Sequence, residues 1–197
     1  MAKSRTNTPA VDIALIAVFA ALLAALSLTP AIPVGGVGVP LTLQTLGVLL
    51  AGLVLGPWRG FLSVVLYLVV GFAGLPVFAG GSGGLAVLAK PSIGFLLSFP
   101  FAAAVAGALA AWFIRRGLRG QYLWFTVAGL AATFLVIYPL GILGMMVVAQ
   151  IDLATAIGYN LAFIPGDIVE VFAAAAIAIA VHKAFPALLA APRPAVA

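Results

Sequence analysis

Asp167 and Glu170 are the residues whose type and spacing most suggest chemistry, because the chain holds only four acidic residues. Residues three apart share one face of a helix, and this pair lies near the start of the last apolar run. Asp167 follows Pro165 and Gly166, so a helix-capping role explains Asp167 alone equally well. A charged group deeper in a membrane helix is costly and usually faces a cavity or the bundle interior. Glu170 therefore predicts a polar cavity beside this helix.

Other polar side chains gather at the same predicted end of the helices. They are Thr42, Gln44 and Thr45 after the first loop, Ser82 and Ser92 in a glycine-rich stretch, and Tyr159 and Asn160 before the last helix. Apolar walls with a few convergent polar groups are typical of a small-molecule pocket. Each residue alone is weak evidence, because Ser and Thr also bond their own helix backbone. Together they predict one pocket.

The glycine-rich stretch at residues 71–99 is the segment that we expect to cover this pocket. It has glycines at 71, 74, 80, 81, 83, 84 and 94, prolines at 76 and 91, and a single lysine, Lys90. Glycine permits positive φ and close approach of the backbone to another group, and proline ends helices. Non-helical backbone at membrane depth is tolerated where protein buries it or it lines a polar cavity. The stretch is therefore predicted to be a loop over a small-molecule site.

Enzymatic chemistry is not expected. The only histidine, His182, and the most suggestive serine, Ser82, fall at opposite ends of predicted spans, about 30 Å apart, too far for a nucleophile and its base. The chain has no cysteine, no cluster with metal-ligand spacing and no GxxxxGK[ST] phosphate loop. We expect neither a metal nor a cofactor, and any energy for active transport has to come from a partner or an ion gradient.

The composition predicts an integral membrane protein. Hydrophobic residues make up 65% of the 197 residues and charged residues 7%, with a mean hydropathy of +1.33. A soluble domain has about a quarter of its residues charged. The net charge of +5 therefore indicates basic cytoplasmic loops and not a nucleic-acid surface. We expect one transmembrane domain over residues 1–197, with a polar amino terminus at 1–10 and a short tail at 186–197.

Six transmembrane helices are expected in an all-α bundle. The apolar runs are 11–28, 41–55, 61–72, 95–114, 122–149 and 163–185. The second and third are short, so they are either two thin helices or one re-entrant hairpin. A kink is expected near Pro139, and residues 150–160 are expected to form a polar outer loop in which Asp152 is solvated.

The distribution of basic residues orients these helices. With a cytoplasmic amino terminus, the cytoplasmic side receives Lys3, Arg5, Arg59, Arg115, Arg116, Arg119, Lys183 and Arg193. The outer side receives only Lys90. Cytoplasmic loops of membrane proteins carry an excess of Lys and Arg, so both termini are expected in the cytoplasm.

The first helix has a stripe of small residues. Ala17, Ala21 and Ala25 lie on one stripe, with Ala20 and Ala24 beside it. Small residues four apart let another helix approach closely. The stripe is either internal packing of the bundle or a docking face for a separate membrane subunit.

Several ordered motifs resemble one family of transport proteins. The run VPLTLQTL at residues 39–46 is followed by LAG at 50–52, LGP at 55–57 and GLPVFAGGSGG at 74–84. PSIGF follows at 91–95 and PGD at 165–167. In this order and spacing the motifs resemble the BioY family, the biotin-binding S components of energy-coupling factor (ECF) transporters.

The resemblance implies a six-helix S component in the bacterial cytoplasmic (inner) membrane that captures biotin. It also implies partners, namely a transmembrane coupling (T) subunit and two ATPase subunits, with the alanine stripe as the docking face. Phe78 and Phe95 are expected to pack on the ligand, and Gly80, Gly81 and Gly84 to let the loop approach it. Thr42, Gln44, Ser92, Tyr159 or Asn160 are expected to hold the ureido group, with Asp167 accepting from its N–H groups.

One departure from the family concerns charge. The family commonly has PGDxxK, and the lysine position is Glu170 here, whereas Lys90 stands where the family usually has glycine. Our hypothesis is that Lys90 replaces the missing lysine and pairs with Glu170, with the substrate carboxylate, or with both. The alternative is a solvated loop lysine. A rival function is a self-sufficient ion-coupled carrier that uses Asp167 and Glu170 as proton sites.

Overall fold

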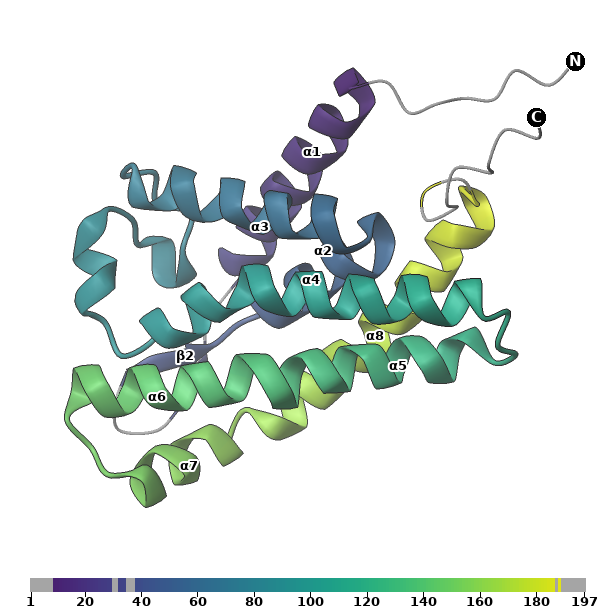
Figure 1. Cartoon of the computed structure of the whole chain (residues 1–197). Coiled ribbons are helices and arrows are strands. Elements are labelled where there is room, and N and C mark those ends of the chain that lie inside the picture. Colours follow the sequence, from purple (N-terminus) through teal and green to yellow (C-terminus); the bar gives the residue numbers. More distant parts are fainter. Residues whose placement is uncertain (1–8, 30–31, 35–37, 187, 189–197) are drawn as a thin grey trace, which may run out of the picture.

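The computed structural model describes residues 9–29, 32–34, 38–186 and 188, and these residues form a helical bundle (Figure 1). Its α-helices are α1 (Pro9–Ser27), α2 (Gln44–Leu55), α3 (Pro57–Phe72), α4 (Ile93–Arg115), α5 (Gln121–Ala132), α6 (Tyr138–Ala149), α7 (Leu153–Leu161) and α8 (Ile164–Ala184). The all-helical prediction is confirmed. Lys3, Arg5 and Arg193, which enter the predicted charge distribution, lie outside the described residues.

Three-residue strands and short helical turns complete the fold. Strands β1 (Ile32–Val34) and β2 (Val39–Leu41) pair antiparallel, with Pro33 opposite Pro40. The glycine-rich stretch is not a plain loop, because it contains the 3₁₀ turns η1 (Ala79–Gly81) and η2 (Leu85–Ala89).

Four of the described helical segments are long and apolar enough to cross a membrane. They are Pro9–Ser27, Ile93–Arg115, Gln121–Ala149 and Ile164–Ala184. The helices α2 and α3 have 12 and 16 residues and are joined at Gly56, whose φ of 83° suits glycine. The third long segment joins α5 to α6 through the π-helical turn η3 (Thr133–Ile137), just before Pro139. The irregularity expected near Pro139 is thus a π turn, which accommodates a residue that has no amide N–H.

The expected polar loop at 150–160 was wrong for most of its length, because α7 occupies Leu153–Leu161. Asp152 is the N-cap of α7 rather than a merely solvated side chain. Its carboxylate accepts from the Thr155 backbone N–H at 3.0 Å and from the Thr155 hydroxyl at 2.7 Å. These hydrogen bonds lower the pKa of Asp152.

Contacts between helix ends show how the chain runs through the bundle. Near the start of α1, Asp12 pairs with Arg59 of α3 at 2.8 Å. Near the end of α8, the His182 ring lies 2.8 Å from the carbonyl of Leu53 at the end of α2. At the last residue of α1, the Ser27 hydroxyl donates to the carbonyl of Val77, in the glycine-rich stretch. One end of the bundle therefore holds the start of α1 and the end of α8, and the other end holds the glycine-rich stretch (Figure 1).

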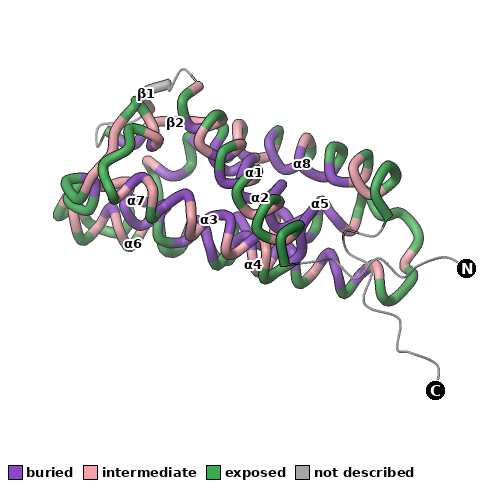
Figure 2. Tube along the Cα trace, turned by 90° about the horizontal axis from the view of Figure 1, so that it is seen from above, coloured by how far each residue is buried: buried purple, intermediate pink, exposed green. Residues whose placement is uncertain are grey.

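Helix α2 is the centre of the packing. All its residues except Leu46 are buried, and it contacts α1, α3, α4 and α8 (Figure 2). Glycine permits the close crossings, since a Cβ on Gly52 would lie 2.2 Å from the Ala103 carbonyl oxygen of α4. A Cβ on Gly94 of α4 would similarly lie 2.2 Å from the Leu140 oxygen of α6. Polar residues at the start of α2 are therefore held inside the bundle.

The alanine residues of α1 divide between two faces. Ala20 is buried in the core, and Ala24 is half-buried against it. Ala17, Ala21 and Ala25 are exposed. Only the second group is free to meet a partner, so the part of the docking prediction that concerns Ala20 and Ala24 is replaced by internal packing.

Candidate ligand-binding site

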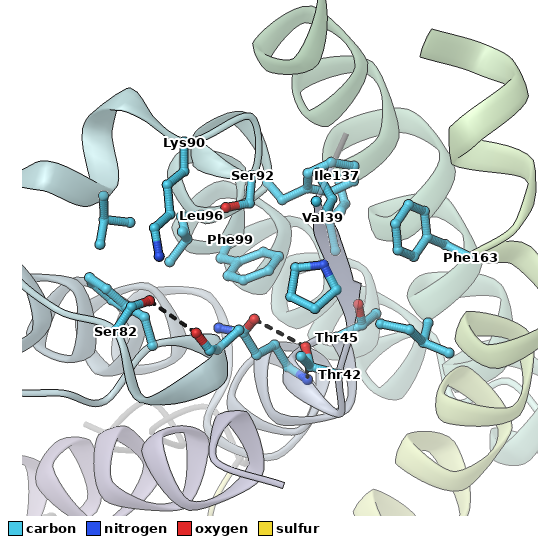
Figure 3. A pocket seen from close by; sticks show the side chains of 18 of the residues that line it. Val39, Thr42, Thr45, Ser82, Lys90, Ser92, Leu96, Phe99, Ile137 and Phe163 are labelled. Atoms are coloured by element: carbon cyan, nitrogen blue, oxygen red, sulfur yellow. Dashed lines mark hydrogen bonds between the residues drawn. The ribbon is translucent and has the colours of Figure 1, made fainter. Parts of the chain in front are cut away.

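A cavity lies where the start of α2, strand β2, the glycine-rich stretch, the start of α4 and the start of α8 meet (Figure 3). The space inside it, its open mouth included, is about 830 Å³. Its walls are Gly38, Val39, Pro40, Leu41, Thr42, Gln44, Thr45, Phe78, Ala79, Ser82, Val87, Lys90, Ser92, Phe95, Leu96, Phe99, Ile137, Phe163 and Asp167. Residues from distant parts of the sequence thus converge on one mostly apolar space.

The glycine-rich stretch is held over the cavity by Phe78. This side chain is 1% exposed and packs edge-on against Tyr67 at 5.3 Å and Phe72 at 5.2 Å between ring centroids. Its ring lies directly over Gly71, where a Cβ would be 2.1 Å from the Phe78 Cζ. The backbone N–H of Gly84 donates to the carbonyl of Gly71 at 2.7 Å. The stretch is therefore docked on α3 by packing and by a backbone hydrogen bond.

Three predicted glycines act on the shape of this stretch and do not line the cavity. Gly80, Gly81 and Gly84 have φ of 69°, 68° and 79°, a left-handed conformation that side chains other than glycine adopt rarely. They turn the chain so that neighbouring Ala79 and Ser82 reach the wall.

The polar groups at the start of α2 are joined in a chain of hydrogen bonds. The Thr42 hydroxyl donates to Gln44 Oε1 at 3.0 Å, and Gln44 Nε2 donates to the Tyr67 hydroxyl at 2.7 Å. Tyr67 in turn donates to the Val77 carbonyl at 3.1 Å. Gln44 therefore lines the cavity and also ties α2 to the glycine-rich stretch through Tyr67.

Asp167 is the acidic group of the cavity. It is 5% exposed, and its Oδ2 accepts from the Tyr138 hydroxyl at 2.8 Å. Tyr138 is itself buried and lies outside the cavity lining, so it supports Asp167 from behind. The Thr45 side chain is a second hydrogen-bonding neighbour of this carboxylate, and Asp167 also lines the cavity. Tyr138 was not among the predicted site residues, because a tyrosine within an apolar run usually indicates a packing role.

Glu170 is not part of the cavity wall. Its Oε2 accepts from the backbone N–H of Leu46 at 2.7 Å. The Lys90–Glu170 pair of our hypothesis is absent from the described residues, in which Arg59–Asp12 is the one ion pair within 4 Å. Lys90 does line the cavity, and Figure 3 shows its amine directed toward the side of Ser82.

Two other predicted ligand contacts lie elsewhere. Asn160 is buried at 4% exposure, and Tyr159 packs beside Phe163 in a small second core. Neither lines the cavity. The apolar wall includes Phe99, Phe163 and Ile137, which the sequence analysis did not select. Phe99 follows Phe95 by one helical turn, and that spacing was the available signal.

The charges of the site are few and separated. Lys90 and Asp167 are the charged side chains of the described cavity wall. Figure 3 shows Lys90 on a different side of the cavity from Thr45, whose side chain is a hydrogen-bonding neighbour of Asp167. The described residues include no group of three or more His, Asp or Glu that could hold a metal ion. The arrangement suits an uncharged ring system with N–H donors at one end and an anionic group at the other.

Comparison with known proteins matches this chain to one family. The model of the BioY family matches residues 1–187. The biotin transporter BioY of Rhizobium etli is 40% identical over 179 residues, covering 90% of this chain and 96% of that protein. The biotin transporter BioY of Rhodobacter capsulatus is 42% identical over 190 residues, with the same coverage of both chains.

A solved structure agrees with the sequence relatives. The crystal structure of the S-component for biotin from an ECF-type ABC transporter superposes with a TM-score of 0.84 at 28% identity. The match covers 90% of this chain and 94% of that one. The resemblance read from residues 39–46, 74–84 and 165–167 is confirmed, and the chain belongs to the BioY family.

Proposed function

We propose that this chain is the biotin-binding S component of an ECF-type vitamin uptake transporter. The observation that carries the proposal is the convergence of separate family motifs on one cavity. Residues of the 39–46, 74–84 and 91–95 segments and Asp167 all line it. The relatives named as biotin transporters and the S-component structure support biotin as the ligand.

The polar groups suggest how biotin would lie. Asp167 accepts from a ureido N–H, with the Thr45 and Ser92 hydroxyls as further partners for the ureido group. The thiophane ring and valerate chain pack among Phe78, Phe95 and Phe99. The biotin carboxylate points toward Lys90, the only cationic side chain in the described cavity wall. Of the two partners that our hypothesis named for Lys90, the substrate carboxylate is kept and Glu170 is removed.

The membrane arrangement that we propose has six crossings in one transmembrane domain, in the bacterial inner membrane. Arg59, Arg115 and Lys183 lie at helix ends away from the cavity, and Lys90 lies at the cavity end. The excess of cytoplasmic Lys and Arg then puts both termini in the cytoplasm and the cavity outside. The exposed alanines of α1 are the proposed contact for a T subunit that joins two ATPase subunits.

Calorimetric titration of the purified full chain in detergent tests the ligand assignment. Biotin is expected to bind saturably, whereas riboflavin, which is larger and lacks the thiophane ring and the valerate carboxylate, is expected to give no binding heat. Asp167→Asn keeps the shape of the side chain but puts an N–H₂ where an acceptor is needed, and should weaken biotin by at least about tenfold. No saturable biotin binding by the wild type would overturn the proposal.

A transport assay distinguishes an ion-coupled carrier from an S component. The chain alone in proteoliposomes is expected to bind biotin without accumulating it, with or without a pH gradient. Accumulation driven by the gradient would replace the S-component assignment with the carrier.

A further inference from the structure

Glu170 makes a contact that ligand binding does not explain. It lies on α8, is 5% exposed and is absent from the cavity wall. Its Oε2 accepts from the backbone N–H of Leu46 at 2.7 Å, a hydrogen bond between residues 124 apart in sequence. The accepting oxygen serves equally as part of a carboxylate or of a neutral carboxylic acid.

Helix α2 needs such an acceptor. The first amide groups of a helix have no intrahelical partner, and the α2 N-cap residue, Leu43, supplies no side-chain cap. Of these amides, the Gln44 N–H donates to Thr42 Oγ1 at 3.3 Å and the Leu46 N–H donates to Glu170 Oε2 at 2.7 Å. A buried donor without a partner costs more than an ordinary hydrogen bond contributes. An acidic side chain at this end also suits the helix dipole.

The same turn of α2 builds the site. Gln44 and Thr45 line the cavity, and they belong to the turn whose amide Glu170 holds. On α8, Asp167 is one helical turn before Glu170 and faces the cavity. The helices α2 and α8 pack directly on each other (Figure 1). One turn of α8 thus supplies an acidic group to the cavity and fixes the neighbouring helix that supplies two more polar groups.

We propose that Glu170 is a positioning residue. It acts as a cap from another helix on the start of α2, holds Gln44 and Thr45 in place relative to Asp167, and does not touch the ligand. The inference rests on the proposed function for its ligand, but the hydrogen bond that it assigns can be tested without one.

A matched pair of substitutions tests the cap. Glu170→Gln keeps an oxygen acceptor in a side chain of nearly the same size, and Glu170→Met removes the acceptor. The Gln variant is expected to bind biotin within about threefold of wild type, and the Met variant at least about tenfold more weakly. The ratio of the dissociation constants of the Gln variant and the wild type should be the same for biotin and for its uncharged amide, because Glu170 makes no contact with the ligand carboxylate. Val169→Met, on the exposed side of the same turn, is the control and should bind like wild type.

Two further measurements separate positioning from general loss of stability. Gln44→Ala should weaken biotin less in the Glu170→Met background than in wild type, because Gln44 is already displaced there. Hydrogen exchange of the full chain in nanodiscs should show the Leu46 amide exchanging faster in the Met variant and at the wild-type rate in the Gln variant.

The outcomes distinguish this inference from the proposed function. If the wild type does not bind biotin, the proposed function fails while the exchange experiment still decides the cap. If the Met variant protects the Leu46 amide as wild type does, or if the Gln variant binds as weakly as the Met variant, the positioning role is overturned. Additive effects of Gln44→Ala and Glu170→Met would also overturn it.

Discussion

Substituting Gly71 by alanine is expected to undock the glycine-rich stretch from α3. The new Cβ would lie 2.1 Å from Phe78 Cζ and 2.4 Å from Cε1. Carbon atoms in contact are about 3.5–4.0 Å apart, so the ring has to move by about 1.4 Å or more. Tyr67 and Phe72 pack against the ring, so the open space into which it can move is the cavity that it lines.

The size of the effect follows from this overpacking. Inserting a methyl group into a packed site costs about 1–3 kcal/mol. Only the docked stretch completes the cavity wall with Phe78, Ala79 and Ser82. If only the docked state binds ligand, a docking cost of about 1–3 kcal/mol lowers the biotin affinity by about 5- to 150-fold.

The assay is calorimetric titration with biotin, with helix content checked by circular dichroism. Gly158→Ala is the matched control, because a Cβ at that helical glycine meets nothing within 4 Å. Replacing Phe78 by leucine removes the clashing atoms, so Gly71→Ala should cost less in that background than in wild type. Biotin affinity of Gly71→Ala within about threefold of wild type would refute the docking argument.

Three further substitutions test separate parts of the structure. Lys90→Ala should weaken biotin by more than about threefold and biotin amide by less, since only biotin has a carboxylate; equal losses would remove the lysine from that role. Gly94→Ala places a Cβ 2.2 Å from the Leu140 oxygen, so it should force α4 and α6 apart and lower the free energy of unfolding by about 1–3 kcal/mol. An unchanged melting temperature would contradict that close crossing. Asp152→Ala removes the cap of α7 and should lower the melting temperature at neutral pH. Because hydrogen bonds from Thr155 lower the pKa of Asp152, its contribution is present above the unfolded-state pKa and is lost as the pH falls through the folded one. The difference between wild type and variant should therefore shrink on acidification, and a constant difference would be evidence against the cap.

Much of the bundle was predictable from the sequence, because long apolar runs have few structural alternatives in a membrane. The end of each run, the shortness of α2 and α3 and the gathering of Thr42, Ser92 and Asp167 at one end all followed from hydropathy and turn residues. Helix α7 was missed because Asp152 and Gln150 made a nine-residue amphipathic segment resemble a loop. The capping role of Asp152 could be recognised only from the structure, in which its carboxylate accepts from the backbone N–H of Thr155.

The details of the site depended on packing that periodicity does not encode. Asp167 and Glu170 were predicted to share one face of a helix and one cavity. In the structure Asp167 lines the cavity, whereas Glu170, one turn later, contacts the Leu46 N–H at the start of α2. Tyr138, which donates to Asp167, directly follows the π turn before Pro139, and the sequence analysis predicted neither the turn nor this hydrogen bond. Gly80 and Gly81 were predicted to let the glycine-rich stretch approach the ligand. In the structure they have positive φ and do not line the cavity.

The most direct test is a structure of the full chain determined with biotin. Density for the vitamin is expected in the cavity, with a ureido N–H within hydrogen-bond distance of the Asp167 carboxylate and the biotin carboxylate toward Lys90. Glu170 should remain on the Leu46 N–H. Biotin bound at another place on the chain, with this cavity empty at saturating ligand, would contradict the account.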